Sequence, residues 1–207
     1  MSLTLGEIRN RVRRGLSATV SQYGDEDIDA DINEAISGAK ADRLFIRVQD
    51  ETLEQTADQY EYPLTGVDVL DYVVFVTDLY PESIETGIFE SEPLSKMLWT
   101  IEGATIPYIS FPTYNWYPDN GKKIRLIGMK EQPQVNTDDD VVYLPESYIV
   151  NKARAFGHNN LSSGAGGGRS SWHGQQVAIR EQYAELARMS AFEYKIPPNS
   201  RIVTGRF

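Results

Sequence analysis

Apolar residues near the start of the chain recur at steps of three and four, a spacing that places them on one face of a helix. Thr4 and Glu7 have the spacing of a capping box, so the first helix is predicted to begin at Thr4 and to reach about Gln22. Its apolar stripe consists of Leu5, Ile8, Val12, Leu16 and Val20. After a short turn, Asp25 is expected to cap a second helix that continues to Leu44. Its stripe consists of Ile28, Ile32, Ala35, Ile36 and Ala39.

The same helical period returns in the last third of the chain. Pro145 and Glu146 suit the first turn of a third helix, whose apolar positions are Ile149, Ala153 and Phe156. A glycine- and serine-rich connector over residues 162–171 separates it from a fourth helix, predicted over 172–194. The stripe of the fourth helix consists of Ile179, Tyr183, Leu186, Ala187, Ala191 and Tyr194. Each of these helices needs other helices to cover its apolar stripe.

Between the two helical pairs, from residue 51, the pattern changes to the alternation that is typical of strands. Strands are predicted over 59–64 and 69–76. A β-hairpin is predicted between residues 108–116 and 122–127, because Asn120 and Gly121 tolerate the positive φ that its turn requires.

The pattern as a whole predicts an α+β fold, in which a four-helix body carries an inserted small antiparallel β module. The body consists of an N-terminal helical hairpin over 1–50 and a C-terminal helical pair over 141–194, and the β module occupies 51–140. An extended C-terminal arm over 195–207 follows the last helix. The twelve residues over 196–207 cannot bury their own apolar side chains, so the arm implies a second surface. Its candidate binding residues are Ile196, Pro197, Pro198, Arg201, Ile202, Val203, Arg206 and Phe207.

The formal net charge of −10 is concentrated in the middle of the chain. Residues 51–140 carry 17 Asp and Glu against 5 Lys and Arg, whereas residues 141–207 carry 4 against 8. A protein that grips nucleic-acid phosphates should show the opposite balance, so we expect no tight DNA binding. Four arginines crowd the first helix, at positions 9, 11, 13 and 14, where they either form a solvated face or meet an acidic neighbour.

Several further patterns exclude other classes of protein. No apolar run approaches the roughly 18 residues of a membrane span, so no membrane partner is expected. The chain has no cysteine and no basic segment followed by an apolar core at its start, so we expect neither disulfides nor a signal peptide. The acidic run at 138–140 lacks the ligand spacing of a calcium loop and is interpreted as a solvated linker.

The sequence also contains few residues in patterns typical of catalytic or metal-binding sites. His158 and His173 are the only histidines, too few for an ordinary zinc site, and we interpret both as capping or surface residues. No nucleophile motif stands out, so we expect no enzyme, no catalytic or metal-binding residues and no cofactor. Twelve of the 22 aromatic residues lie between Tyr60 and Tyr117. They form either the core of a small sheet or, with Trp99 and Trp116, a sugar-binding platform.

Short motifs spread along the chain resemble those of the head–tail connector (adaptor) proteins of tailed bacteriophages. The resemblance is carried by residues 5–9 (LGEIR), 25–28 (DEDI), 31–36 (DINEAI), 60–64 (YEYPL) and 144–148 (LPESY). It implies a structural virion protein that forms a homo-oligomeric ring, commonly a dodecamer, between the portal protein and the tail. The ring would line the DNA channel of the neck, and DNA would pass through it during ejection without sequence-specific binding.

The resemblance also implies partners and a location. In such proteins the C-terminal segment often reaches the portal, so the candidate arm residues would bind the portal protein, and a tail or further neck protein would bind elsewhere. The protein would assemble in the host cytoplasm and reside at the head–tail junction of the virion. Two alternatives remain open: another neck component, such as a head-completion or tail-completion protein, and a carbohydrate-binding module using the aromatic residues of the β module.

Overall fold

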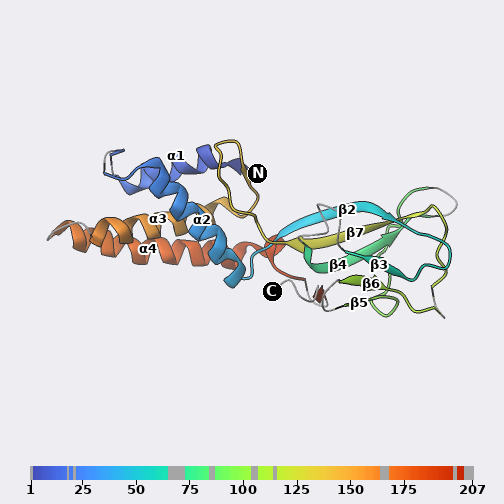
Figure 1. Cartoon of the computed structure of the whole chain (residues 1–207). Helices are drawn as coiled ribbons and strands as arrows, with labels where there is room; N and C mark the ends of the chain where they lie inside the picture. Colours follow the sequence, from blue (N-terminus) through green and yellow to red (C-terminus); the bar gives the residue numbers. More distant parts are fainter. Residues whose placement is uncertain are drawn as a thin grey trace. The chain divides into compact units, whose positions relative to one another are not determined.

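The computed structural model contains four helices and small antiparallel sheets, which confirms the α+β fold with four helices (Figure 1). The structure describes residues 2–17, 19–20, 22–64, 73–83, 87–103, 107–113, 116–163, 168–197 and 200–202. The chain divides into a helical unit, Met1–Phe45 with Gln132–Lys195, and a β unit, Ile46–Glu131 with Ile196–Phe207. Residues 46–50 therefore belong to the β unit, and residues 132–140, expected in the β module, belong to the helical unit.

The helical unit is arranged around its third helix. Its elements are α1 (Leu5–Leu16), α2 (Asp25–Ala41), α3 (Glu146–Ser163), α4 (Gly168–Ser190), the 3-10 helix η2 (Phe192–Tyr194), and the paired strands β1 (Leu3–Thr4) and β8 (Val141–Val142). The helix α3 packs against α1, α2 and α4, and α1 packs against α2. Because α4 packs mainly on α3, much of its surface is left without a covering helix.

The start of α1 follows the sequence prediction, but its end does not. The N–H of Glu7 donates to Thr4 Oγ1 at 3.3 Å, and the N–H of Thr4 donates to Glu7 Oε2 at 3.1 Å, which completes the capping box. The helix ends at Leu16, because Ser17 adopts a left-handed backbone with φ 54°. Val20, which the periodicity placed in the stripe, is 65% exposed.

The β unit contains a four-stranded sheet of order β2-β7-β4-β9 and a three-stranded sheet of order β3-β6-β5. The strands of the larger sheet are β2 (Ile46–Glu54), β4 (Val73–Pro81), β7 (Lys123–Lys130) and β9 (Arg201–Ile202). Those of the smaller sheet are β3 (Glu61–Pro63), β5 (Thr100–Glu102) and β6 (Tyr108–Ser110). All of the pairings in both sheets are antiparallel.

The predicted hairpin between residues 108–116 and 122–127 is wrong. The strand β6 pairs with β3 and β5, whereas β7 pairs with β2 and β4 in the other sheet. The turn itself exists, with Gly121 at φ 79°, but it leads the chain from one sheet to the other. The reason is that β2, which the periodicity did not predict, supplies a long partner for β7, with Ile46 opposite Lys130. Residues 65–72, which include the start of the strand predicted over 69–76, lie outside the described residues.

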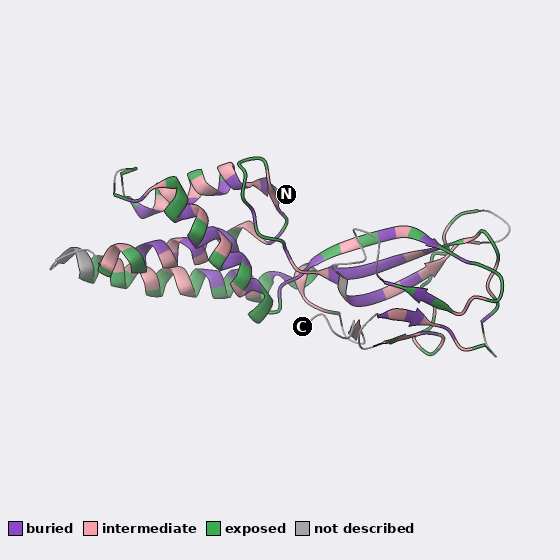
Figure 2. Ribbon diagram, in the orientation of Figure 1, coloured by how far each residue is buried: buried purple, intermediate pink, exposed green. Residues whose placement is uncertain are grey.

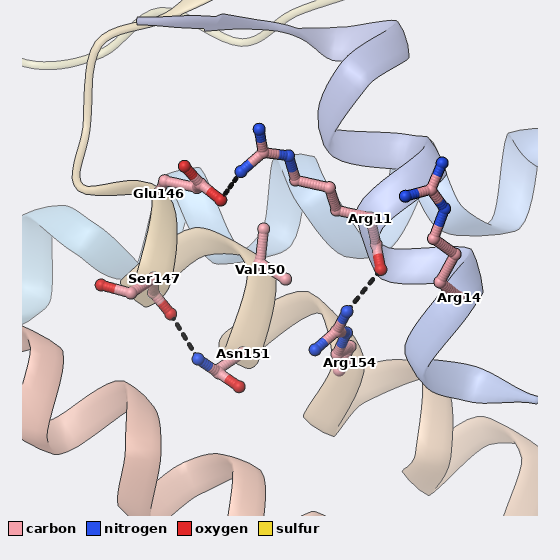
Figure 3. A pocket seen from close by; sticks show the side chains of 7 residues that line it. All are labelled: Arg11, Arg14, Glu146, Ser147, Val150, Asn151 and Arg154. Carbon is pink, nitrogen blue, oxygen red and sulfur yellow. Dashed lines mark hydrogen bonds and ion pairs between the residues drawn. The ribbon is translucent and has the colours of Figure 1, made fainter. Parts of the chain in front are cut away.

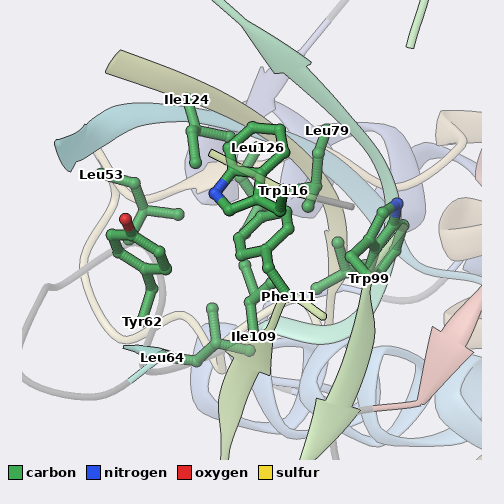
Figure 4. Packing of buried hydrophobic residues seen from close by; sticks show 11 residues of the cluster. Leu53, Tyr62, Leu64, Leu79, Trp99, Ile109, Phe111, Trp116, Ile124 and Leu126 are labelled. Atoms are coloured by element: carbon green, nitrogen blue, oxygen red, sulfur yellow. The ribbon is translucent and has the colours of Figure 1, made fainter. Parts of the chain in front are cut away.

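Side chains from both sheets form the core of the β unit (Figure 4). Phe111 stacks on Trp116 with ring centroids 4.4 Å apart and meets Tyr62 edge-on at 5.7 Å. The remaining members of the cluster are Leu53, Leu64, Val76, Leu79, Trp99, Ile109, Ile124 and Leu126. The aromatic residues that the sequence concentrates in this region thus serve, in large part, to fill a small core.

Candidate partner-binding surfaces

The candidate arm residues Arg201 and Ile202 lie in the chain's own sheet. They form β9 and pair with Val76 and Phe75 of β4. The guanidinium of Arg201 also donates from Nη2 to the carbonyl of Lys96 at 2.8 Å. Part of the extended arm therefore has a partner within the β unit, and the second surface inferred from the sequence is not needed to order these two residues.

The structure describes two of the other six candidate arm residues. Ile196 is half-buried and Pro197 is exposed. Pro198, Val203, Arg206 and Phe207 lie outside the described residues. Of the eight candidate residues, the structure therefore describes only Ile196, Pro197, Arg201 and Ile202.

The apolar stripe predicted for the fourth helix divides between two faces of α4. Ala187 in α4 and Ala191 just beyond its end are buried, as is Ala184, which the predicted stripe did not include. The larger residues expected beside them are exposed, with Tyr183 at 51% and Leu186 at 54%. Small residues at an interface let two helix backbones approach closely, which explains why the alanines occupy the side that packs in the unit.

The result is an exposed apolar face on α4 and η2, which we call the α4 face. It consists of Trp172, Ile179, Tyr183, Leu186, Met189 and Phe192. Spacings of seven, four and three residues place Trp172, Ile179, Tyr183 and Leu186 on one side of α4, and Met189 and Phe192 follow at the end of the helix and in η2. Exposed positions recur along α4 (Figure 2). Single exposed apolar residues are ordinary, but a continuous row of large ones marks an interaction surface.

The two tryptophans of the β unit do not form an open platform. Trp99 is 2% exposed and Trp116 is 8% exposed, and both belong to the core cluster. A sugar-binding platform needs ring faces that are open to solvent. Tyr117, which is 77% exposed, lies beside Trp116 in the sequence but is not part of that cluster.

Most of the arginines on α1 have acidic partners within the helical unit. Arg9 donates to Asp29 at 2.7 and 2.6 Å and pairs with Asp138 at 2.8 Å. These carboxylates raise the pKa of Arg9 further above its ordinary range. Arg13 pairs with Asp25, and Arg11 with Glu146. Of the two interpretations of the basic face, contact with acidic neighbours therefore holds for these three residues.

The acidic segment before β8 is a structured part of the helical unit. The carboxylate of Asp140 accepts from the N–H groups of Asn136 and Thr137, and these bonds lower its pKa. The backbone carbonyls of Asp138 and Asp140 accept from the N–H groups of Gly6 and Leu5, at the start of α1. The segment therefore caps a helix, which the interpretation as a solvated linker did not anticipate.

The interior of the helical unit contains polar groups that the sequence did not single out. Tyr23 donates to Asp31 Oδ2 at 2.7 Å, and the amide of Asn160 donates to Asp31 Oδ1 at 3.2 Å. Burial raises the pKa of Asp31 to about 7. His158 is fully buried, and its Nδ1 lies 3.0 Å from Nδ1 of His173, so it is not a surface residue. Burial lowers the pKa of His158 to about 4.

Metal and membrane sites are not found among the residues that the structure describes. No group of three or more histidine, aspartate or glutamate side chains is placed to hold a metal ion there. In that same part of the chain, no helix has the length and apolar character of a membrane span.

No protein-family model matches this chain, and no curated protein matches its sequence.

Proposed function

We propose that this protein is a structural joint of a bacteriophage neck, a head–tail connector that assembles into a ring between portal and tail. The observation that carries the proposal is the α4 face, which leaves five large apolar side chains exposed on α4 and a sixth on η2, in a unit that has its own core. Exposed apolar surface of this kind is stabilised when another protein covers it. The α4 face therefore serves as the contact between adjacent subunits of the ring.

The positions of the resembling motifs support the same proposal. Residues 5–9 open α1 behind its capping box, and residues 25–28 open α2. Residues 144–148 open α3, where the carbonyl of Pro145 accepts from the N–H groups of Tyr148 and Ile149. Three of the five motifs thus fall at helix starts, whereas residues 31–36 continue α2 and residues 60–64 contain β3.

The charge distribution is compatible with passage of DNA. An acidic segment beside a channel repels phosphates, although salt limits this repulsion to about 8 Å under physiological conditions. Another neck component would also use an apolar face to bind its neighbour. Identifying the protein that covers the α4 face therefore distinguishes a connector from another neck component. A carbohydrate-binding module gains no support from Trp99 and Trp116, because both rings are buried.

The α4 face is tested by native mass spectrometry and by binding to the portal ring of the same phage. Leu186→Ser and Tyr183→Ser should reduce ring assembly, because both side chains are more than half exposed and form the middle of the face. Met97→Ser is the matched control, since Met97 is 89% exposed on the β unit. All three variants should keep the wild-type melting temperature.

Two outcomes contradict the proposal. If the wild-type protein stays monomeric at all concentrations, both alone and with the portal ring, the connector assignment fails. If it assembles but the two α4 variants assemble equally well, the α4 face is not the contact. Substitutions are preferable to truncation after Tyr194, because truncation also removes β9 from the four-stranded sheet.

A further inference from the structure

A pocket of about 510 Å³ lies between α1 and α3 of the helical unit (Figure 3). Its lining residues are Arg11, Arg14, Glu146, Ser147, Val150, Asn151 and Arg154. Three of the seven are arginines, and Glu146 is the single carboxylate among the lining residues. A volume of this size accommodates a side chain together with adjacent backbone and exceeds what an isolated ion needs.

Two of the three guanidinium groups are left without a compensating carboxylate. Arg11 forms an ion pair with Glu146. Arg14 is exposed and has no hydrogen-bond or ion-pair partner among the described residues. Arg154 donates from Nη2 to the carbonyl of Arg11 at 2.5 Å, whereas its buried Nε has no partner within the described part of the chain. The pocket therefore holds an excess of positive charge in a protein whose net charge is −10.

The local backbone makes room for one of these arginines. A methyl group at Gly15 would overlap the Arg154 side chain, so the absence of a side chain at Gly15 lets Arg154 lie across α1. Burial, and then the nearby charge of Arg180, lower the pKa of Arg154. A guanidinium remains charged even so, and a buried, unpaired N–H of a charged group is costly. Arg154 is thus held in a position where an anion would stabilise it.

We propose that this pocket binds the carboxylates of an acidic peptide segment from a partner protein. Arginine pairs with carboxylates through two parallel hydrogen bonds; Arg14 is exposed and unpaired among the described residues, and Arg154 adds a positive charge that no carboxylate compensates there. Nucleic acid is a poorer occupant, because its binding depends on many phosphate contacts along a basic surface. Here the excess charge sits in one pocket, with Glu146 in its wall. This site is separate from the α4 face and does not depend on the connector proposal.

The test measures fluorescence anisotropy of a labelled hexaglutamate peptide with the full-length protein. The wild type should bind, and raising the salt from 50 to 500 mM should weaken binding because the contact is ionic. Arg14→Gln and Arg154→Gln should each weaken it at least five-fold. Arg43→Gln is the matched control, because Arg43 is an exposed arginine of the helical unit outside the pocket. A labelled hexaglutamine peptide should not bind.

Gly15→Ala adds a variant that changes no charge. It should weaken peptide binding by displacing Arg154 while leaving the total charge of the protein unaltered. Arg14→Gln keeps the test informative if Arg154→Gln fails to fold, because Arg14 is exposed. The proposal is overturned if the wild type does not bind hexaglutamate at millimolar concentration. It is also overturned if binding is the same in Arg14→Gln, or if duplex DNA binds in place of the peptide with the same dependence on Arg14.

Discussion

Gly157 of α3 lies directly against Leu16, the last residue of α1. A Cβ atom at position 157 would come within 2.8 Å of Leu16 Cδ2 and 3.0 Å of Asp31 Oδ2. All three residues are buried, so neither neighbour can move into solvent. The close approach of α1, α2 and α3 therefore depends on a position that carries no side chain.

We expect Gly157→Ala to destabilise the protein by about 1–3 kcal/mol through overpacking. The measurement is the free energy of unfolding from urea denaturation followed by circular dichroism. Gly174→Ala in α4 is the matched control, because no atom lies within 4 Å of an added Cβ there. That control should be neutral or stabilising by up to about 1 kcal/mol, from the higher helix propensity of alanine. Equal effects of the two substitutions would contradict the packing argument.

The buried carboxyl of Asp31 should make stability depend on pH. Its folded-state pKa of about 7 lies above the ordinary value of 3.8, so the stabilisation is complete below about pH 3.8 and is lost as pH rises through 7. Asp31→Asn removes this dependence. The free energy of unfolding of the wild type minus that of Asp31→Asn should therefore fall, by up to about 4 kcal/mol, between pH 4 and 7.

His158 acts in the opposite direction over part of that range. Its pKa is lowered to about 4, so its contribution is present above pH 6.5 and is lost as pH falls through 4. Both proteins contain His158, so the difference between wild type and Asp31→Asn isolates the carboxyl. Asp139→Asn, at an exposed position, is the control. If the free energy of unfolding of the wild type minus that of Asp31→Asn does not change with pH, the Asp31 carboxyl titrates in the folded protein as it does in the unfolded chain.

Local signals in the sequence were sufficient for the starts of α1 and α3, but not for α4, which begins at Gly168 within the predicted connector. The Thr4 capping box and the proline before α3 act through neighbouring backbone groups, so their effect can be read from a few residues. The end of α1 could not be predicted in the same way, because Val20 continues the helical period although the helix stops at Leu16.

The pairing of strands could not be predicted because it is settled by distant segments. Residues 120–121 indicated a hairpin, but β2 is the partner that β7 takes in the folded chain. The burial of the predicted α4 stripe could not be predicted for a related reason. The sequence shows which positions are apolar, but not whether the alanines or the larger residues pack against α3. The arginine pocket was missed because Arg154 is far in sequence from Arg11 and Arg14, although the crowding of arginines on α1 was a usable signal.

Asn33 ties α2 to the segment that precedes β8. Its amide donates to the carbonyl of Val135 at 2.8 Å and accepts from the N–H of Val135 at 2.9 Å. Asn33→Ala should cost about 1–3 kcal/mol, because it leaves the backbone of a buried residue unpaired. Asn136→Ala, at an exposed position, should change the free energy of unfolding by less than about 0.5 kcal/mol. An Asn33→Ala protein as stable as the wild type would mean that water replaces both bonds.

Phe111 joins the rings of Trp116 and Tyr62 in the core of the β unit. Phe111→Ala should lower stability by about 3–5 kcal/mol, as expected for loss of a buried aromatic side chain. It should also change the near-ultraviolet circular dichroism of Trp116, because that ring loses its stacked partner. Tyr117→Ala is the control, since that ring is exposed, and it should leave both measurements close to wild type. A strong effect of Tyr117→Ala together with a weak effect of Phe111→Ala would contradict this core.

The strand β9 follows all four helices in the sequence, yet it completes a sheet whose other strands precede α3. During synthesis, Phe75 and Val76 on the second edge of β4 therefore stay unpaired by β9 until residues 201–202 have emerged from the ribosome. An unpaired strand edge readily adds a strand from another molecule. Nascent chains on one polysome would pass through an aggregation-sensitive interval, and rapid translation of the helical segment would shorten it.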